Sequence, residues 1–170
     1  MPLELLIDGY NVIKQSPYLS QFDAVDLEEG RRALIERLAA YRRIRGHKIS
    51  VVFDAWGSPH VYRQDRSHRG VTIIFTRHGE TADEWIKRRL RDIGAGIVVT
   101  SDREIREYAH QMGIVTIISR DFERKMDEAI LCEMKGIEND NGELMRPTKK
   151  GTAKRLSKKE RKRRSITERL

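Results

Sequence analysis

The chain has 170 residues, of which 35% are charged and 6% aromatic, a composition typical of a soluble globular protein. No apolar run approaches the roughly 20 residues that span a bilayer, and the N-terminus lacks a signal-peptide pattern, so we expect a cytoplasmic protein that does not contact membranes. The single cysteine, Cys132, excludes an internal disulfide and agrees with a reducing compartment.

The net charge of +8 is concentrated at one end of the chain. Residues 147–170 hold 11 of the 34 basic residues but only two of the 26 acidic ones, which leaves 23 basic and 24 acidic residues in 1–146. We therefore predict a nearly neutral body followed by a basic arm that binds a polyanion.

Five short runs rich in valine and isoleucine predict buried, parallel strands. They cover residues 3–7, 49–53, 71–75, 97–100 and 114–118. Apolar stripes at helical spacing follow most of them, in residues 27–41, 82–93, 105–112 and 122–130. Residues 54–70 show no helical pattern. The turn-rich stretch 138–150 ends the domain, which gives a domain of 1–137 and a basic arm of 138–170, flexible or helical on RNA.

Acidic side chains follow four of the predicted strands. Asp8, Asp54 and Asp102 come at or just after strand ends, and Asp83 lies in a helix start after the third strand. Because ligands of open parallel sheets bind beyond the carboxyl ends of the strands, we expect these carboxylates to share one edge. Their mutual repulsion would be relieved by a divalent cation, and carboxylate oxygens suit Mg²⁺ or Mn²⁺.

Each acid also has a purely structural interpretation. Thr81-x-x-Glu84 and Ser101-x-x-Glu104 both have the spacing of a capping box, which would make Asp83 and Asp102 first-turn residues favoured by the helix dipole. Asp8 is the hardest to explain in this way, because it directly follows a fully apolar strand.

Four segments resemble a known family: residues 6–13, 51–55, 80–84 and 98–102, the first of which contains Asp8-Gly9-Tyr10-Asn11. In this order they are similar to the NYN-domain proteins of the PIN-like nuclease superfamily, in the YacP-like branch. The resemblance covers residues 3–135 and not the segment after Lys149. It implies a three-layer α/β/α PIN-like sandwich around a mainly parallel five-stranded sheet, in the order 3-2-1-4-5, to which the basic C-terminal extension is added.

The resemblance also implies a metal-dependent endoribonuclease that cleaves mRNA, with the ribosome as a partner. Asp8, Asp83 and Asp102 would then bind the metal, and Asp54 would reach it through water. Asn11 would orient Asp8 or a water molecule, and Ser101 would contact phosphate or metal-bound water. Hydrolysis of this kind leaves 5′-phosphate and 3′-hydroxyl ends.

Two sets of basic residues are candidates for RNA binding. The arm supplies a set of six: Lys158, Lys159, Arg161, Lys162, Arg163 and Arg164. The loop of residues 54–70 supplies Arg63, Arg66 and Arg69, with Trp56 and Tyr62 as stacking partners. The alternative for the arm is a solvated, nonspecific tail.

Other functions compete with the nuclease. The first is a non-catalytic RNA- or ribosome-binding module on the same fold. A haloacid-dehalogenase-like phosphatase is disfavoured because Gly9-Tyr10 follow Asp8 where that class needs a second aspartate, and a response-regulator receiver lacks its acidic pair and late lysine. A toxin would use the same chemistry in another role, and the oligomeric state is not readable from the sequence.

Overall fold

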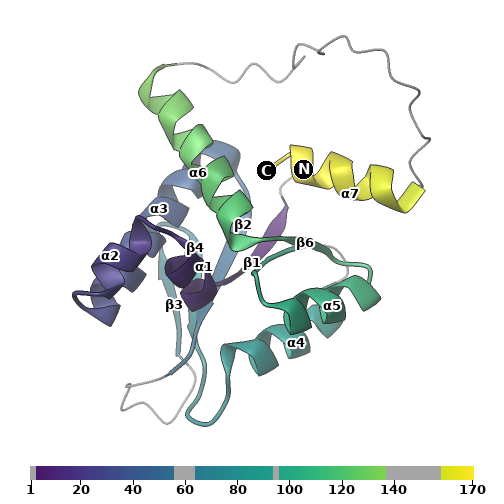
Figure 1. The fold of residues 1–170 in the computed structure, drawn as a ribbon, viewed down its shortest axis with the longest axis horizontal. Coiled ribbons are helices and arrows are strands. Elements are labelled where there is room, and N and C mark those ends of the chain that lie inside the picture. The colour runs from purple at the N-terminus through teal and green to yellow at the C-terminus, as the bar shows by residue number, and fades with distance from the viewer. Residues whose placement is uncertain (1–2, 56–63, 94–95, 137–157) are drawn as a thin grey trace.

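The computed structural model describes residues 3–55, 64–93, 96–136 and 158–170 (Figure 1). The strands within these residues are β1 (Glu4–Asp8), β2 (Lys48–Phe53), β3 (Gln64–His68), β4 (Val71–Phe75), β5 (Ile97–Val99) and β6 (Val115–Ile117). The helices are α1 (Gly9–Gln15), α2 (Leu19–Asp23), α3 (Leu27–Arg45), α4 (Ala82–Asp92), α5 (Arg103–Gln111), α6 (Ser119–Met134) and α7 (Lys158–Glu168). None of these helices has both the length and the apolar character needed to cross a bilayer.

The described strands form one sheet in the order β3-β4-β2-β1-β5-β6. All neighbouring strands are parallel except β3, which runs antiparallel to β4. The five predicted strands and their order are confirmed, but the prediction of a five-stranded sheet was wrong by one strand, because β3 is polar throughout. The hairpin that forms it turns at Arg69 (φ 46°) and Gly70 (φ 82°), a pair of left-handed residues that suits the twist of two antiparallel strands.

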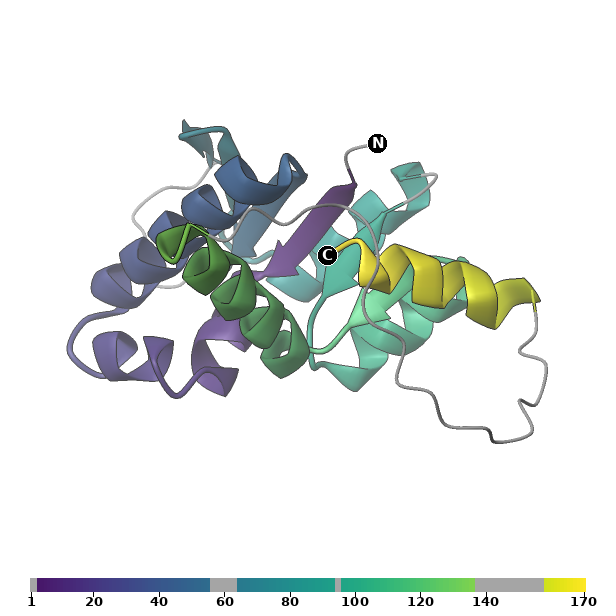
Figure 2. The same cartoon turned by 90° about the horizontal axis from the view of Figure 1, so that it is seen from above.

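Alternating residues of each strand enter two separate cores, which makes the three layers. Leu5 and Ile7 of β1 pack with helices α1, α3 and α6, whereas Leu6 between them packs with α4 and α5. Figure 2 shows α3 and α6 on one side of β1 and α4 and α5 on the other. Because both faces of these strands are buried, their sequences are continuous apolar runs.

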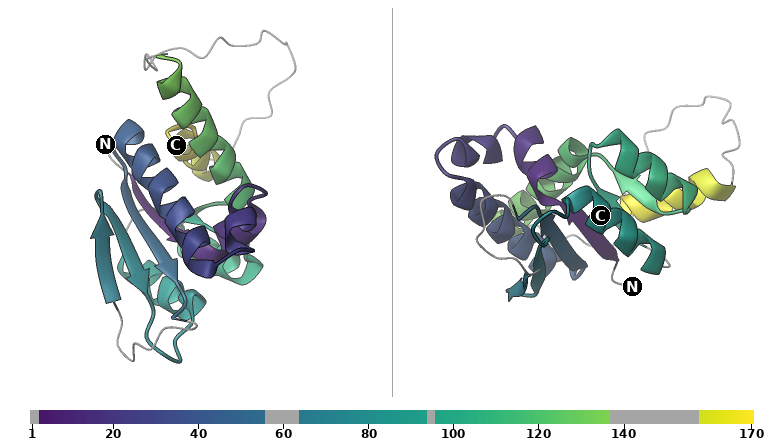
Figure 3. Two further views of the ribbon diagram at one scale, coloured as in Figure 1. Left: turned by 90° about the vertical axis from the view of Figure 1, so that its left-hand side faces the viewer. Right: turned by 90° about the horizontal axis from the view of Figure 1, so that it is seen from below.

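The last helix, α7, returns to the domain and lies beside β6 at the edge of the sheet (Figures 1 and 3). Leu170 is only 2% exposed and belongs to the core beneath α3 and α6, and Ile166 packs against the same core. The Tyr41 hydroxyl donates to the Leu170 carbonyl, and the His47 ring bonds the Arg169 carbonyl at 3.2 Å. The end of the basic arm is therefore anchored in the fold.

Candidate active site

Asp8 ends β1 and caps α1, and it is buried with 8% of its surface exposed. Its Oδ1 accepts a hydrogen bond from the Asn11 backbone N–H at 3.3 Å, and its Oδ2 accepts one from the Thr100 hydroxyl at 3.0 Å. The pKa of Asp8 is raised from 3.8 to about 6. Burial is the largest cause; the two hydrogen bonds lower the pKa and the charges of Asp83 and Asp54 raise it. A carboxylate is thus held in a position where its charge is unfavourable, which is a common property of functional sites.

Gly9 lets α1 begin directly after Asp8. A Cβ at this position would lie 2.3 Å from the ring of Phe53, so a side chain has no room. Tyr10 then packs edge-on against the same ring, with 5.2 Å between centroids. The close approach fixes the turn that aims Asp8 at the carboxyl edge of the sheet.

Asn11 ties three strand ends together. Its Oδ1 accepts hydrogen bonds from the Ser101 N–H at 2.8 Å and the Ser119 hydroxyl at 2.7 Å. The Ser101 hydroxyl in turn accepts from the Ser119 N–H at 3.2 Å. Asn11 therefore orients Asp8 through its backbone N–H, while its side chain fixes the β5–α5 and β6–α6 turns.

Asp102 is the N-cap of α5, and its Oδ1 accepts from the Glu104 and Ile105 N–H groups at 2.8 and 3.1 Å. The predicted capping box of Ser101 and Glu104 was wrong, because Asp102 and not Ser101 is the N-cap. The Thr100 hydroxyl accepts from the Asp102 N–H at 3.1 Å while it donates to Asp8. Thr100 thus links the two aspartates across β1 and β5.

Asp54 and Asp83 meet at the start of α4. The predicted capping box of Thr81 and Glu84 is confirmed. Asp54 uses its Oδ1 to accept from the Ala82 N–H, whereas Asp83 lies in the first turn, with Oδ2 3.6 Å from the Lys87 ammonium. Burial, followed by the charge of Asp102, raises the pKa of Asp83, and Lys87 lowers it.

The four aspartates lie at one edge and influence one another's charge: Asp8, Asp54, Asp83 and Asp102. Within the residues that the structure describes, no three histidine, cysteine or acidic side chains converge into a ready metal site. The donor set nevertheless suits a hard divalent cation, since Oδ2 of Asp102 accepts no hydrogen bond from the described part of the chain and the mutual repulsion of the carboxylates favours added positive charge.

Three residues of this site were not predicted as site residues: Thr100, Ser119 and Lys87. Ser119 follows the fifth predicted strand, so the rule that sheet ligands gather at strand ends could have found it. Lys87 bridges Asp83 and Glu104 between α4 and α5, an ion pair that only the packing of the two helices creates.

The predicted RNA-binding residues are divided among several places. The Arg66 guanidinium lies over the ring of Phe75, 5.7 Å from its centroid, near the carboxyl end of β4. Arg69 pairs with Glu36 at the β3–β4 turn, at the opposite end of the sheet from Asp8.

The remaining residues of these sets are on the arm or outside the described parts. Arg63, Trp56 and Tyr62 lie outside the described residues. The six basic arm residues are on α7; Arg161 and Arg164 are exposed and Arg163 is half-buried.

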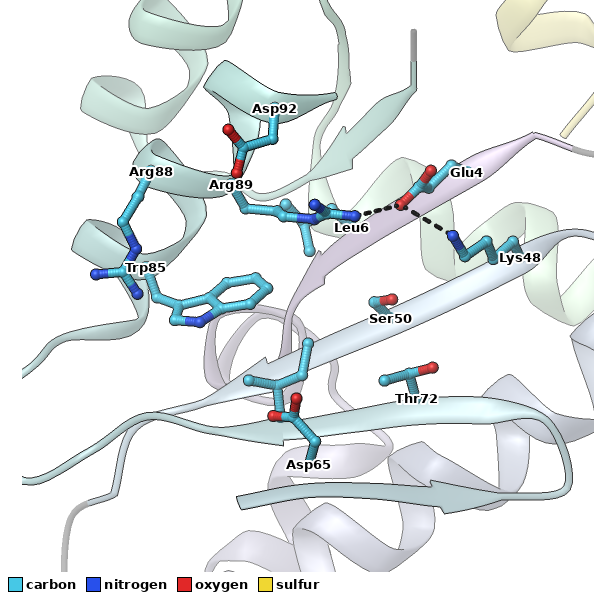
Figure 4. Close-up of a pocket in the computed structure, with 11 residues that line it drawn as sticks. Glu4, Leu6, Lys48, Ser50, Asp65, Thr72, Trp85, Arg88, Arg89 and Asp92 are labelled. Carbon is cyan, nitrogen blue, oxygen red and sulfur yellow. Dashed lines mark hydrogen bonds and ion pairs between the residues drawn. The ribbon is translucent and has the colours of Figure 1, made fainter. Parts of the chain in front are cut away.

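A cavity of about 420 Å³ lies against α4, and none of the four aspartates of the candidate site lines it (Figure 4). Ser50 and Thr72 line it from the sheet, and Trp85 lines it from α4. Glu4 lies within 3.5 Å of Arg89 and 3.6 Å of Lys48 and balances their charge. Because Glu4 starts β1 and Asp8 ends it, this cavity opens toward the other end of the strands and carries none of the candidate chemistry.

A three-layer α/β sandwich with aspartates at its carboxyl edge is consistent with a PIN-like domain. The YacP-like NYN domain family matches residues 5–167, and the chain belongs to this family. The match extends through α7, beyond the residues 3–135 that carried the resemblance in the sequence. Membership indicates an RNA-related nuclease.

Relatives from Bacillus subtilis are similar to this chain. The protein YacP of strain 168, described as uncharacterized, is 41% identical over 102 residues, which are 58% of this chain and 59% of YacP. The crystal structure of Rae1 (YacP) is 30% identical with a TM-score of 0.67 and covers 81% of this chain and 80% of its own. A second crystal structure, of a Rae1 mutant, gives 29% identity and the same TM-score, covering 83% of this chain and 86% of its own. The chain thus matches less than two thirds of the curated YacP sequence.

Proposed function

We propose that this protein is a metal-dependent endoribonuclease that hydrolyses phosphodiester bonds within RNA. The observation that carries the proposal is Asp8, a buried carboxylate with a raised pKa, held by Thr100 and Asn11 beside Asp83 and Asp54. A fold stabilised by its core alone has no use for such a group, whereas a hydrolase does.

Asp8, Asp83 and Asp102 would hold Mg²⁺ or Mn²⁺, with Asp54 contributing through water. When bound, the cation would supply charge neutralisation at the phosphate and a more acidic water. The chain's own residues prepare this edge. Thr100 and the Asn11 N–H keep Asp8 oriented, and Lys87 limits the repulsion at Asp83. Direct hydrolysis would leave 5′-phosphate and 3′-hydroxyl ends and would not use the RNA 2′-hydroxyl.

The substrate we propose is mRNA in the cytoplasm, presented by the ribosome. The resemblance to the YacP-like branch suggests this presentation, and the excess of basic residues after residue 147 supports a polyanionic substrate.

A non-catalytic RNA- or ribosome-binding module is the second candidate. It is favoured by one observation, that no three metal-ligating side chains converge within the described residues. It predicts RNA binding that never leads to cleavage.

The test is cleavage of 5′-labelled RNA by wild type and Asp8→Asn in Mg²⁺, Mn²⁺ or EDTA, with and without translating ribosomes. Asp26→Asn is the matched control, because Asp26 is exposed and its side chain makes no capping bond. We expect cleavage by wild type and the control that is lost in EDTA and in Asp8→Asn. Intact RNA in every lane, with RNA still bound, would replace the nuclease with the binding module.

A further inference from the structure

A second cavity, of about 530 Å³, lies between α5 and α7. Figure 1 shows these two helices on either side of β6, and Thr116 of β6 lines the cavity between them. One face of α5 supplies most of the remaining lining: Arg103, Arg106, Glu107, His110 and Gln111. Arg163 lines it from α7. We call this cavity the α5–α7 cleft.

The cleft has an excess of positive charge. Glu107, the acid among its described lining residues, is paired with Arg103 at 2.7 Å. Within the described parts of the chain, neither Arg106 nor Arg163 forms an ion pair. Two guanidinium groups from different helices thus face the same cavity with no ion-pair partner among the described residues, which is an arrangement suited to anions with several oxygens.

The cleft begins at the acidic edge. Arg103 directly follows Asp102, the N-cap of α5, and the lining residues continue along one face of the helix at i, i+3, i+4, i+7 and i+8. Eight residues of α-helix extend about 12 Å, at about 1.5 Å per residue. With one phosphate per about 3.4 Å of a stacked strand, that length accommodates about three phosphates.

We infer that the α5–α7 cleft binds the phosphates of the RNA strand that flank the scissile bond. The inference rests on the proposed function, because the acidic edge repels a polyanion and adjacent cations would compensate for this repulsion. An acidic peptide would be drawn by the same charge, but the position of Arg103 directly after Asp102 favours the strand that is cut at the acidic edge.

The inference assigns the arm a definite role. α7 forms a wall of the cleft only while it is held against the domain. The buried Leu170, its contact with Tyr41 and the contact of Arg169 with His47 hold it there. Cations on a solvated tail would act by charge alone, whereas the cleft also requires the anchor. A variant that releases α7 without changing the charge separates these two cases.

The experiment measures binding of a 5′-fluorescein oligouridylate by fluorescence anisotropy in EDTA, where no cleavage occurs. In the double variant Arg106→Gln/Arg163→Gln we expect about a tenfold loss of affinity and a decrease in salt slope of about 0.7 for each phosphate contact removed. The matched control is Arg32→Gln/Arg43→Gln, which removes two exposed arginines of α3 and should bind like wild type. Leu170→Ser should weaken binding although it removes no charge.

Each other outcome overturns the inference in a distinct way. If the double variant binds RNA as tightly as wild type, the cleft is not an RNA-binding site. If Leu170→Ser also binds like wild type, the arm contributes to binding only as a solvated, charged tail. Polyglutamate at the same concentration of charge is the competitor. If it displaces the RNA, and the double variant loses affinity for RNA and polyglutamate equally, the cleft binds acidic proteins. Cleavage assays in Mn²⁺ separate the two proposals. The double variant should keep kcat while KM rises, whereas failure of wild type to cleave would reject the nuclease and leave the binding result standing.

Discussion

The carboxyl edge and the α5–α7 cleft are neighbours built on opposite principles. At the edge, Asp8 is buried, its pKa is raised and its oxygens are fixed by hydrogen bonds. In the cleft, Arg106 is exposed and Arg163 half-buried, and neither side chain makes an ion pair within the described residues. The buried carboxylate at the edge therefore lowers the stability of the fold but would provide a catalytic group. The arginines of the cleft can bind RNA with little effect on stability. A substitution at the edge should lower activity without lowering stability. A substitution in the cleft should lower RNA affinity without changing catalytic activity or stability.

The largest expected effect is that of Asp8→Asn, which should reduce cleavage to background and yet stabilise the protein. Since one pKa unit corresponds to about 1.4 kcal/mol, and the pKa of Asp8 is raised from 3.8 to about 6, mainly by burial, we expect a gain of up to about 3 kcal/mol at neutral pH. Urea unfolding in EDTA measures it.

The pH dependence checks the cause of that gain. Folded wild type binds a proton at about pH 6, above the unfolded value of 3.8, so its stability rises as the pH falls through this window. The advantage of Asp8→Asn should shrink accordingly. If Asp8→Asn were less stable than wild type at neutral pH, the charge of the Asp8 carboxylate would not destabilise the fold.

Asn11→Ala should have the next largest effect. It should lower activity because Asn11 positions other residues of the site, not because Asn11 contacts the substrate. It removes the acceptor shared by Ser101 and Ser119, and loss of a supporting group of this kind typically costs about 10–100-fold. We expect kcat to fall while RNA affinity in EDTA is unchanged. If Asn11→Ala keeps the kcat of wild type, the shared acceptor does not position the carboxyl edge.

Leu170→Ala tests the cleft wall without touching charge. Truncation of a buried leucine costs about 2–5 kcal/mol, but near the end of the arm the cost should appear as local release of α7. Hydrogen exchange should therefore accelerate in α7 and not in β1 or β2. Acceleration throughout the sheet would instead make Leu170 a part of the global core.

The smallest effect concerns His47, whose pKa is lowered mainly by burial. Because the unfolded chain takes up the proton first, stability is lost as the pH falls through the ordinary value of 6.5. The Tm of wild type should fall more steeply than that of His47→Gln between about pH 7.5 and about pH 5.5. If the two curves of Tm against pH are parallel, His47 is in contact with solvent and burial does not lower its pKa.

The sequence predicted best what depends on buried strands. The Val- and Ile-rich runs set five strands, and the residues that follow them led to Asp8 and Asp102. β3 was missed because an edge strand with polar side chains has no apolar period, and only its pairing with β4 makes it a strand. The anchoring of Leu170 was missed because it depends on Tyr41, 129 residues away in the chain.

The position of α7 beside β6 also bears on self-association. The sheet has two edges, and an unpaired strand edge is a template for pairing with another molecule. β3 protects one edge with polar side chains, and α7 lies against the other. A shortened version of this protein that ends before residue 158 would expose β6, so we expect it to aggregate at concentrations where the whole chain remains monodisperse.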